Sequence, residues 1–314
     1  MRTIIVVLLL SFTFYINTAA QGCSDAGFCT AGSLSVNTHD DTSNAAQTWV
    51  SAAFSYGLSD FDVQVISPRL EVRHSFDSVW QASARIGMQI TNGDLTSTIG
   101  LSDVIVTGGC NLLPELQLTL GAKFPLNNAD MRISYPSLPP EGSPLNAPLP
   151  MDYQPSLGTI DVIAGVVWHL GDFSLAAAMQ QPLTQNSNTF TPDVYPATSA
   201  AHQYHPTNGF NRQADVLLRA SYMLSTFEEK LRMHLSVLPI YHVANDTYVD
   251  STSVRREIVG SRGVTLNAAL LFEYVLSDYN RIELTIAAPV VVRTIRPDGL
   301  TRSILIGVEY RTRL

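Results

Sequence analysis

Long segments in which apolar and polar residues alternate are the feature that most constrains this chain of 314 residues. Between Val264 and Tyr274 every second residue is apolar, whereas the intervening positions include Thr265, Asn267 and Glu273. Successive side chains of a β-strand point to opposite faces, so a period of two predicts strands with one apolar and one mixed face. Sustained helical periodicity is missing, and no apolar run of 18 residues follows the first twenty positions. The sequence therefore predicts an all-β protein without transmembrane helices.

Reading every alternating segment in this way gives about twelve predicted strands. Most are longer than the roughly 5–6 residues common in soluble sheets, and they reach the roughly 9–11 residues that cross a bilayer at a tilt. Their length and even number predict a transmembrane, antiparallel, up-and-down β-barrel. The predicted strands span approximately residues 48–58, 61–74, 77–91, 99–110, 115–126, 158–169, 172–184, 209–225, 229–244, 262–276, 280–293 and 301–313.

The connections between these strands sort by length. Every second connection is a tight turn, whereas the intervening ones include three long segments, residues 127–157, 185–208 and 245–261. Long extracellular loops and short periplasmic turns are the rule for outer-membrane barrels, and a soluble β-sandwich, the alternative fold, has no reason to follow it. Aromatic residues near strand ends agree with interfacial girdles. They are Trp49, Trp80, Phe124, Trp168, Phe173, Tyr241, Tyr274 and Tyr310.

The first twenty residues have the organisation of a secretory signal peptide. A short positive start, Met1-Arg2, precedes an apolar core at residues 4–10, and Ala19-Ala20 supplies the small residues that signal peptidase needs. We expect cleavage after Ala20 and export of the mature chain. Together with the strand pattern, this predicts a protein of the bacterial outer membrane.

A polar N-terminal segment, residues 21–47, separates the signal peptide at 1–20 from the barrel at 48–314. Cys23 and Cys29 lie six residues apart, which predicts a small disulfide loop in an oxidising compartment. The segment either plugs the lumen in part or forms a periplasmic tail. The third cysteine, Cys110, falls in an apolar strand and is expected to act as a small hydrophobe.

Charged residues make up only 15 % of the chain, well below the ~25 % of soluble globular proteins. Because the net charge is −8 and no run of Lys or Arg is present, we expect no binding of nucleic acid. A barrel explains the shortage, since the lipid-facing half of each strand carries no charge. The charged half then lines the lumen. The predicted lumen residues are Arg69, Glu71, Arg73, Arg85, Asp103, Lys123, Asp161, Arg219, Arg232, Glu273 and Glu309, accompanied by Gln81, Glu115, Gln117, His169, Asp215, His234, His242, Arg281, Glu283, Arg293 and Arg311.

Acidic and basic residues alternate between neighbouring predicted strands, so cross-strand ion pairs are available. These residues either form a network that stiffens the wall or line a polar path for a small solute, with arginines at its constriction. One barrel can combine both roles.

One region resembles a known group of barrels. Residues 96–126 contain Gly100-Leu101-Ser102-Asp103, and then Gly121, Lys123 and Pro125. This pair of segments is similar to two consecutive strands of the FadL-like and phenol-degradation outer-membrane transporters, and residues 154–161 are similar to the loop-to-strand segment that follows. The match covers about 70 residues, with Ser102 in place of a second glycine and without the family's N-terminal hatch sequence. The resemblance implies an outer-membrane transporter.

The expected function is therefore passive passage of a small solute through a charged lumen, with membrane lipid as surroundings and no cofactor, metal or enzymatic activity. One alternative is a barrel that serves a cell-envelope protein complex through its long loops. Another is a hydrolase resembling outer-membrane phospholipase A, for which His234, Ser236 and Asn267 are the candidate residues. The alternation places His234 and Ser236 inward, whereas that family's catalytic residues face lipid.

Overall fold

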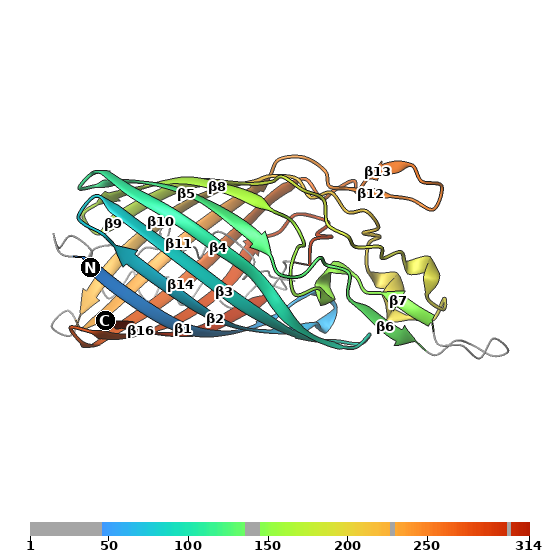
Figure 1. The fold of residues 1–314 in the computed structure, drawn as a ribbon, viewed down its shortest axis with the longest axis horizontal. Coiled ribbons are helices and arrows are strands. Elements are labelled where there is room, and N and C mark those ends of the chain that lie inside the picture. The colour runs from blue at the N-terminus through green and yellow to red at the C-terminus, as the bar shows by residue number, and fades with distance from the viewer. Residues whose placement is uncertain (1–45, 136–144, 227–229, 300–302) are drawn as a thin grey trace.

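In the computed structural model, which describes residues 46–135, 145–226, 230–299 and 303–314, twelve antiparallel strands close into one barrel. Figure 1 shows the tilted strands from the side. The first strand, β1, pairs with the last strand, β16, so no strand edge is left open. This confirms the predicted fold class. The barrel strands are β1 (Gln47–Leu58), β2 (Gln64–Ser75), β3 (Trp80–Asn92), β4 (Ser97–Leu113), β5 (Leu116–Pro125), β8 (Asp161–Leu170), β9 (Phe173–Pro182), β10 (Asp215–Thr226), β11 (Leu231–His242), β14 (Gly263–Ser277), β15 (Asn280–Val291) and β16 (Ile304–Arg313).

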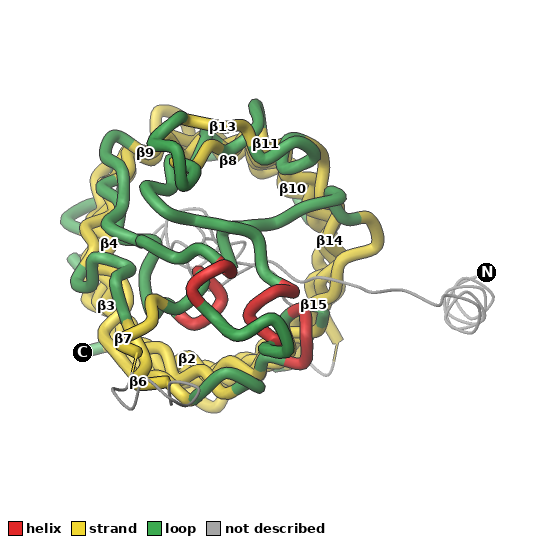
Figure 2. The backbone as a smooth tube through the Cα atoms, turned by 90° about the vertical axis from the view of Figure 1, so that its right-hand side faces the viewer, coloured by secondary structure: helices red, strands yellow, loops and turns green. Residues whose placement is uncertain are grey.

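The two ends of the barrel differ as the sequence predicts. Tight turns join the strands at the end where β1 starts and β16 finishes, and long loops gather at the opposite end (Figure 1). We call these the turn end and the loop end. The loops carry two small hairpins and four short 3-10 helices, and Figure 2, which looks along the barrel, shows that part of this loop structure crosses the opening. The loop elements are η5 (Asp60–Asp62), β6 (Arg132–Tyr135), β7 (Leu145–Pro148), η6 (Met151–Tyr153), η7 (Pro192–Val194), η8 (Ala200–Gln203), β12 (Thr247–Val249) and β13 (Arg255–Glu257).

Some strand boundaries differ from those predicted. β10 starts at Asp215 rather than at residue 209, so Arg212, which lies within the predicted strand 209–225, is instead a buried loop residue. β4 continues to Leu113 with a register shift after Asn111, so Glu115 lies exposed in the turn and not on the lumen face. β15 ends at Val291, which leaves Arg293 in a loop.

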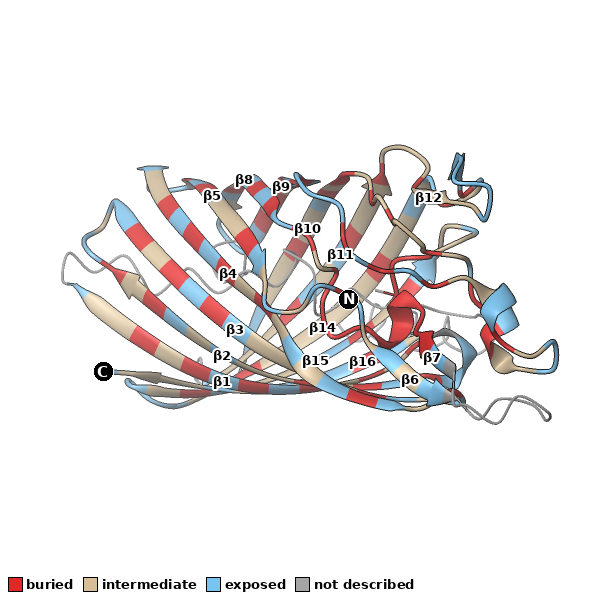
Figure 3. Cartoon of the chain, turned by 45° about the vertical axis from the view of Figure 1, so that its right-hand side comes forward, coloured by how far each residue is buried: buried red, intermediate tan, exposed pale blue. Residues whose placement is uncertain are grey.

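Covered and more exposed side chains alternate along the barrel strands, most regularly on β1 to β4 and β9, as the colour bands of Figure 3 show for β1 to β4. The outward side chains are apolar and exposed, and Leu120 on β5 reaches 67 % exposure. Apolar surface this extensive is foreign to a soluble monomer and is what lipid requires. Large hydrophobic residues of this outer face include Phe54, Leu70, Val72, Ile99, Leu101, Val106, Leu118, Leu175, Leu218, Val237, Val290, Ile306 and Val308.

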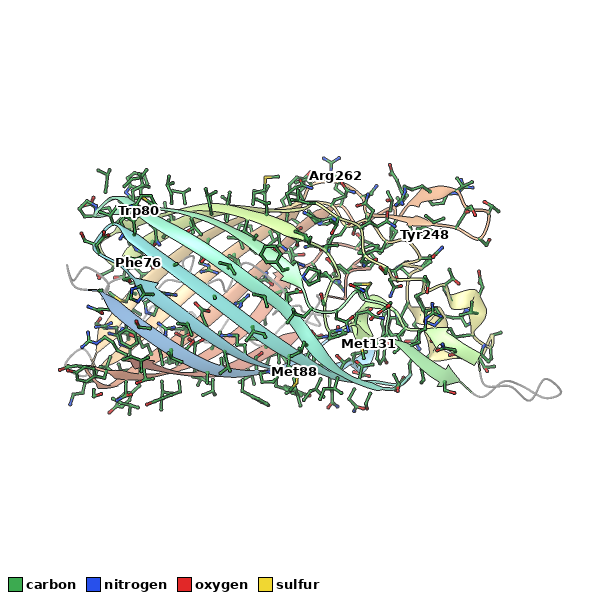
Figure 4. The ribbon with its side chains drawn as sticks, in the orientation of Figure 1. Phe76, Trp80, Met88, Met131, Tyr248 and Arg262 are labelled. Atoms are coloured by element: carbon green, nitrogen blue, oxygen red, sulfur yellow. The ribbon has the colours of Figure 1, made fainter. Side chains whose placement is uncertain are left out.

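Aromatic residues form a girdle at the turn end. Phe76 and Trp80, on either side of one turn, project outward there (Figure 4). Phe173 packs against Tyr222 with ring centroids 4.6 Å apart, and the exposed rings of Trp168, Tyr274, Tyr279 and Tyr310 continue the belt.

Trp49 was wrongly expected in this belt. It shares the inward face of β1 with Ser51 and Ala53, is only 6 % exposed, and carries the guanidinium of Arg281 4.9 Å from its ring centroid. Whether an aromatic residue at a strand end faces lipid or lumen therefore depends on which of the two alternating faces of the strand it occupies, and not on its closeness to the strand end.

Several predictions concern the N-terminal region and lie outside the described residues: the signal peptide at 1–20, the segment at 21–45 and the Cys23–Cys29 disulfide. Cys110 is a free thiol of intermediate exposure on β4. Within the described part of the chain, no helix is long and apolar enough to cross a membrane.

The lipid-facing role of the outer surface predicts the effect of a charge placed on it. Leu120→Arg should lower the free energy of unfolding by about 2–4 kcal/mol, because the side chain lies near the middle of β5 and must desolvate a cation in lipid. Val259→Arg, on an exposed loop outside the barrel, should have little effect. The measurement is a reversible denaturant titration in phospholipid vesicles, and equal stabilities of the two variants would argue against a lipid-facing β5.

Candidate functional site

Every Asp, Glu, Lys and Arg in the barrel strands points into the lumen. This is the physical cause of the low charge content, since the outward halves of the strands carry none. Basic residues outnumber acidic ones on the inner wall, although the whole chain has a net charge of −8. The basic side chains are Arg69, Arg73, Arg85, Lys123, Arg219, Arg232, Arg281, Arg311 and Arg313, and the acidic ones are Glu71, Asp103, Asp161, Asp215, Glu273, Glu283 and Glu309.

A charged wall runs over β11, β14, β15, β16 and β2. Glu273, Glu283 and Glu309 are register neighbours on three successive strands, which would be repulsive without nearby cations. Arginines interleave with them and bridge neighbouring carboxylates. The N–O distances are 3.2 Å for Arg232–Glu273, 3.7 Å for Arg281–Glu273, 3.5 Å for Arg311–Glu283, 3.0 Å for Arg311–Glu309 and 2.9 Å for Arg69–Glu309.

Arg73 and Glu71 extend this charged wall along β2, with an N–O distance of 3.7 Å. Six of the predicted lumen residues therefore meet here: Arg69, Glu71, Arg73, Arg232, Glu273 and Glu309. The cross-strand pairing that the sequence predicts is present.

An apolar wall lies across the lumen from the charged one, on β4 and β8 to β11. The apolar side chains among the inward residues of these strands pack into one buried cluster, in which Ile163 and Leu217 are almost completely covered. The sequence did not predict this wall, because only charged and polar positions were expected to line the lumen. The cluster comprises Ile105, Ile163, Val167, Ala176, Ala178, Leu217 and Leu238.

A segment of the longest loop is inserted into the mouth of the barrel. Residues 147–157 are all buried although they form no barrel strand. Their backbone carbonyls are satisfied by polar side chains. Gln89 of β3 donates to the Gln154 carbonyl at 3.0 Å, and Thr98 of β4 donates to the Tyr153 carbonyl at 2.7 Å. We call residues 147–157 the inserted segment.

Loop residues hold the other side of the inserted segment. Asn188 donates to the Leu149 carbonyl at 3.0 Å, and Tyr195 donates its hydroxyl to the Pro148 carbonyl at 2.8 Å. Apolar side chains, among them the fully buried Tyr153 and Phe190, fill the space between. Because buried backbone groups need such partners, the segment has a fixed place in the mouth.

Lys123 ties the inserted segment to the wall. Its ammonium group is completely buried, 3.5 Å from Asp103 and 3.2 Å from Asp161. Ser156 of the inserted segment donates to Asp103 at 2.5 Å, and Thr159 donates to Asp161 at 2.6 Å.

The residues that carry the resemblance to FadL-like transporters lie together around Lys123. At Gly100 a Cβ atom would come within 2.8 Å of the Pro155 ring, so glycine is needed for the close approach of strand and segment. Gly121 likewise faces the Val106 carbonyl, where a Cβ would lie 2.7 Å away. Gly100 therefore lets the inserted segment dock on the wall, whereas Gly121 lets β5 lie close to β4.

A second buried cluster joins three loop regions at the loop end. His242, the last residue of β11, contacts Asp215 through Nδ1 at 2.7 Å and Asp246 through Nε2 at 2.8 Å. Arg212 pairs with Asp215 and, at 3.4 Å, with Asp298. Arg293 reaches Asp298 at 2.5 Å and Asp246 at 3.9 Å. We call these six residues the loop cluster.

Burial opposes ionisation of Asp298, but its ion pairs with Arg293 and Arg212 outweigh burial and hold its pKa well below the usual range. Sequence reasoning assigned His242, Asp215 and Arg293 to the lumen, and missed Arg212, Asp246 and Asp298. Those three lie in loops, where no periodicity identifies which polar residues turn inward.

A cavity of about 290 Å³ opens beside the inserted segment at the loop end. Its walls are Phe61, residues 150–152 of the inserted segment, Tyr204 with His205, and residues 294–297. Phe61 has a left-handed backbone conformation (φ 55°). Its ring packs edge-on against the ring of Tyr204, with the ring centroids 5.0 Å apart. Burial lowers the pKa of His205, which favours its neutral form. We call this cavity the vestibule.

Arg85 and Arg219, two further predicted lumen residues, also face inward. Arg85 lines a small cavity of about 30 Å³ with Arg69 and Asp103, on the lumen side of β2 to β4. Arg219 lies on β10, in register with Ala176 of the apolar wall.

The hydrolase candidates lie on the inner wall, not on the lipid face. His234 and Asn267 are buried there, and Ser236 shares a hydrogen bond of 2.7 Å with Ser221. Among the described residues, no group of three or more His, Cys, Asp or Glu side chains is arranged to hold a metal ion.

Comparisons with known proteins identify the fold. No family model matches the chain, and no curated protein matches it in sequence. An outer membrane channel from Pseudomonas putida F1 is similar in structure, with a TM-score of 0.54, 13 % identity, and coverage of 89 % of this chain and 100 % of that chain. The NanC porin has a TM-score of 0.42, 10 % identity, and coverage of 84 % and 97 %. The fold is that of bacterial outer-membrane β-barrels, whereas the resemblance to FadL-like transporters stays a prediction.

The buried Lys123 site predicts a large effect of neutralising the lysine. Lys123→Met should lower the free energy of unfolding by about 3–5 kcal/mol, because Asp103 and Asp161 then remain buried without their cation. The other lysine of the chain, Lys230, lies exposed in a turn, so Lys230→Met is the matched control and should unfold like the wild type. Adding Asp103→Asn and Asp161→Asn to Lys123→Met should recover part of the loss. Equal stability of the two lysine variants in a denaturant titration would contradict the role of Lys123 in holding the inserted segment on the wall.

Proposed function

We propose that this protein is a passive channel of the outer membrane that conducts small solutes through its lumen and prefers anions. The carrying observation is the sorting of charge: every charged strand residue faces the lumen, and basic side chains are in excess there. A barrel that served only as a membrane anchor or scaffold would need no excess of one sign of charge in its lumen, and each ionised group that it buried would cost desolvation.

The excess of basic residues supports a preference for anions. Arginine keeps its charge at all physiological pH values, and a ring of such groups lowers the energy of an anion in a narrow pore. In the charged wall, neighbouring carboxylates share arginines. The wall therefore presents a row of cationic groups to a passing anion. The apolar wall across the lumen suits a solute that also has an apolar part.

The inserted segment supports selective rather than open diffusion. It narrows the mouth, and the vestibule beside it gives a solute of modest size a place to enter. We infer that the vestibule is the outer entrance and that Arg69 and Arg85, which share the small cavity deeper in the barrel, stand along the path.

Ion selectivity in planar bilayers tests the proposal. In a salt gradient the wild type should show a reversal potential that favours chloride over potassium. Arg85→Ala/Arg219→Ala should reduce this preference several-fold, because it removes the excess of basic over acidic groups on the inner wall.

Arg255→Ala/Arg256→Ala is the matched control, since it removes two arginines from the exposed β13 hairpin outside the barrel. This control should keep the selectivity of the wild type. Absence of conductance in bilayers, together with absence of solute uptake in liposomes, would overturn the channel function. A cation-selective wild type would overturn the anion preference.

A further inference from the structure

The loop cluster is electrically neutral only when His242 carries a proton. It contains three carboxylates, Asp215, Asp246 and Asp298, and two guanidinium groups, Arg212 and Arg293. A protonated His242 supplies the third positive charge. All six side chains are at most 9 % exposed, so an unbalanced charge would have little water to stabilise it.

The hydrogen bonds of His242 require the same protonation state. Each ring nitrogen lies within 2.8 Å of a carboxylate oxygen, Nδ1 beside Asp215 and Nε2 beside Asp246. An ionised carboxylate only accepts hydrogen bonds, so both ring nitrogens must donate, and this is possible only for the imidazolium. Loss of the proton breaks one of the two bonds and leaves the cluster with a net negative charge.

The loop cluster holds one wall of the vestibule. Arg293 and Asp298 belong to the cluster, and the four residues between them, 294–297, line the cavity. Gly299 follows directly and packs against the backbone of Met151 and Asp152, where a Cβ would lie 2.5 Å from a main-chain atom. Residues 293–299 therefore connect His242 to the inserted segment.

We propose that His242 is a proton-controlled latch of the mouth. When it is protonated, the three loop regions are held together and the 293–299 stretch stays against the inserted segment. When it loses its proton, Asp215 and Asp246 repel each other and this stretch moves away, which widens the vestibule. The inference rests on the proposed channel function and names its regulation.

The imidazole of His242 is the side chain of the loop cluster whose ordinary pKa lies nearest neutral pH. Arg212 and Arg293 stay charged, and the ion pairs of Asp298 keep it ionised far into the acid range. Asp161, the next carboxylate toward the wall and electrostatically coupled to Arg212, has Lys123 at 3.2 Å. Because two carboxylates stabilise the imidazolium, we expect the latch to be closed at pH 6 and to open as the pH rises to about 9.

Single-channel conductance at pH 6 and pH 9 tests the latch in the full-length mature protein. The single-channel conductance of the wild type should be at least about threefold higher at pH 9 than at pH 6. His242→Gln is neutral at both values and should conduct well at both. His242→Lys keeps a cation between the two carboxylates and should conduct poorly at both. His205→Gln, which changes the vestibule histidine outside the cluster, should keep the pH response of the wild type.

Backbone hydrogen exchange of the wild type gives an independent measurement that needs no variant and no current. Residues 293–299 should lose protection at pH 9 by about tenfold or more after correction for intrinsic rates, whereas the strands should not. A conductance that is equal at both pH values, or a response that persists in His242→Gln, would overturn the latch, as would unchanged protection of 293–299. If no variant conducts but protection still falls, the channel function fails and the latch stands.

Discussion

A membrane interior offers no partner for an unpaired backbone group and no solvation for a charge, and this single constraint accounts for most of the molecule. Closing the sheet through the β1–β16 pair removes the last free strand edge. Turning every charged strand residue inward removes the charge from lipid. The low charge content of the chain is thus an average over an outer face that has none and an inner face where most of the strand polarity is concentrated.

Collecting the charges inside the barrel brings like charges close together, and ion pairs with opposite charges offset their repulsion. Three glutamates are neighbours on β14 to β16, and they would repel one another. The arginines between them form ion pairs with adjacent glutamates and offset this repulsion. The same arrangement stiffens the wall and offers fixed cationic groups to a solute. The two interpretations that the sequence leaves open are therefore not exclusive. Because the apolar wall lies opposite, the lumen has one charged side and one apolar side.

The mouth depends on buried polar contacts between loops rather than on strand pairing. Lys123 fixes the inserted segment to the wall, and the loop cluster around His242 fixes the 293–299 stretch to the neighbouring loops. Both clusters place ionised groups where water has little access, so each depends on the opposite charges that surround it. The two clusters are neighbours in the mouth, because Gly299 packs directly on the inserted segment.

The sequence by itself determined the barrel, its strand number, the sorting of its turns and loops to opposite ends, and the inward side of most of its charged residues, because a period of two and loop lengths are local properties that survive folding. It misplaced Trp49 and Glu115, whose positions depend on parity and on a register shift near a strand end. Only the tertiary structure decided how Arg212, Asp246 and Asp298 meet His242, how residues 147–157 enter the mouth, and that one wall of the lumen is apolar. Those contacts join loops and strands far apart in the chain, and no spacing within a single segment encodes them.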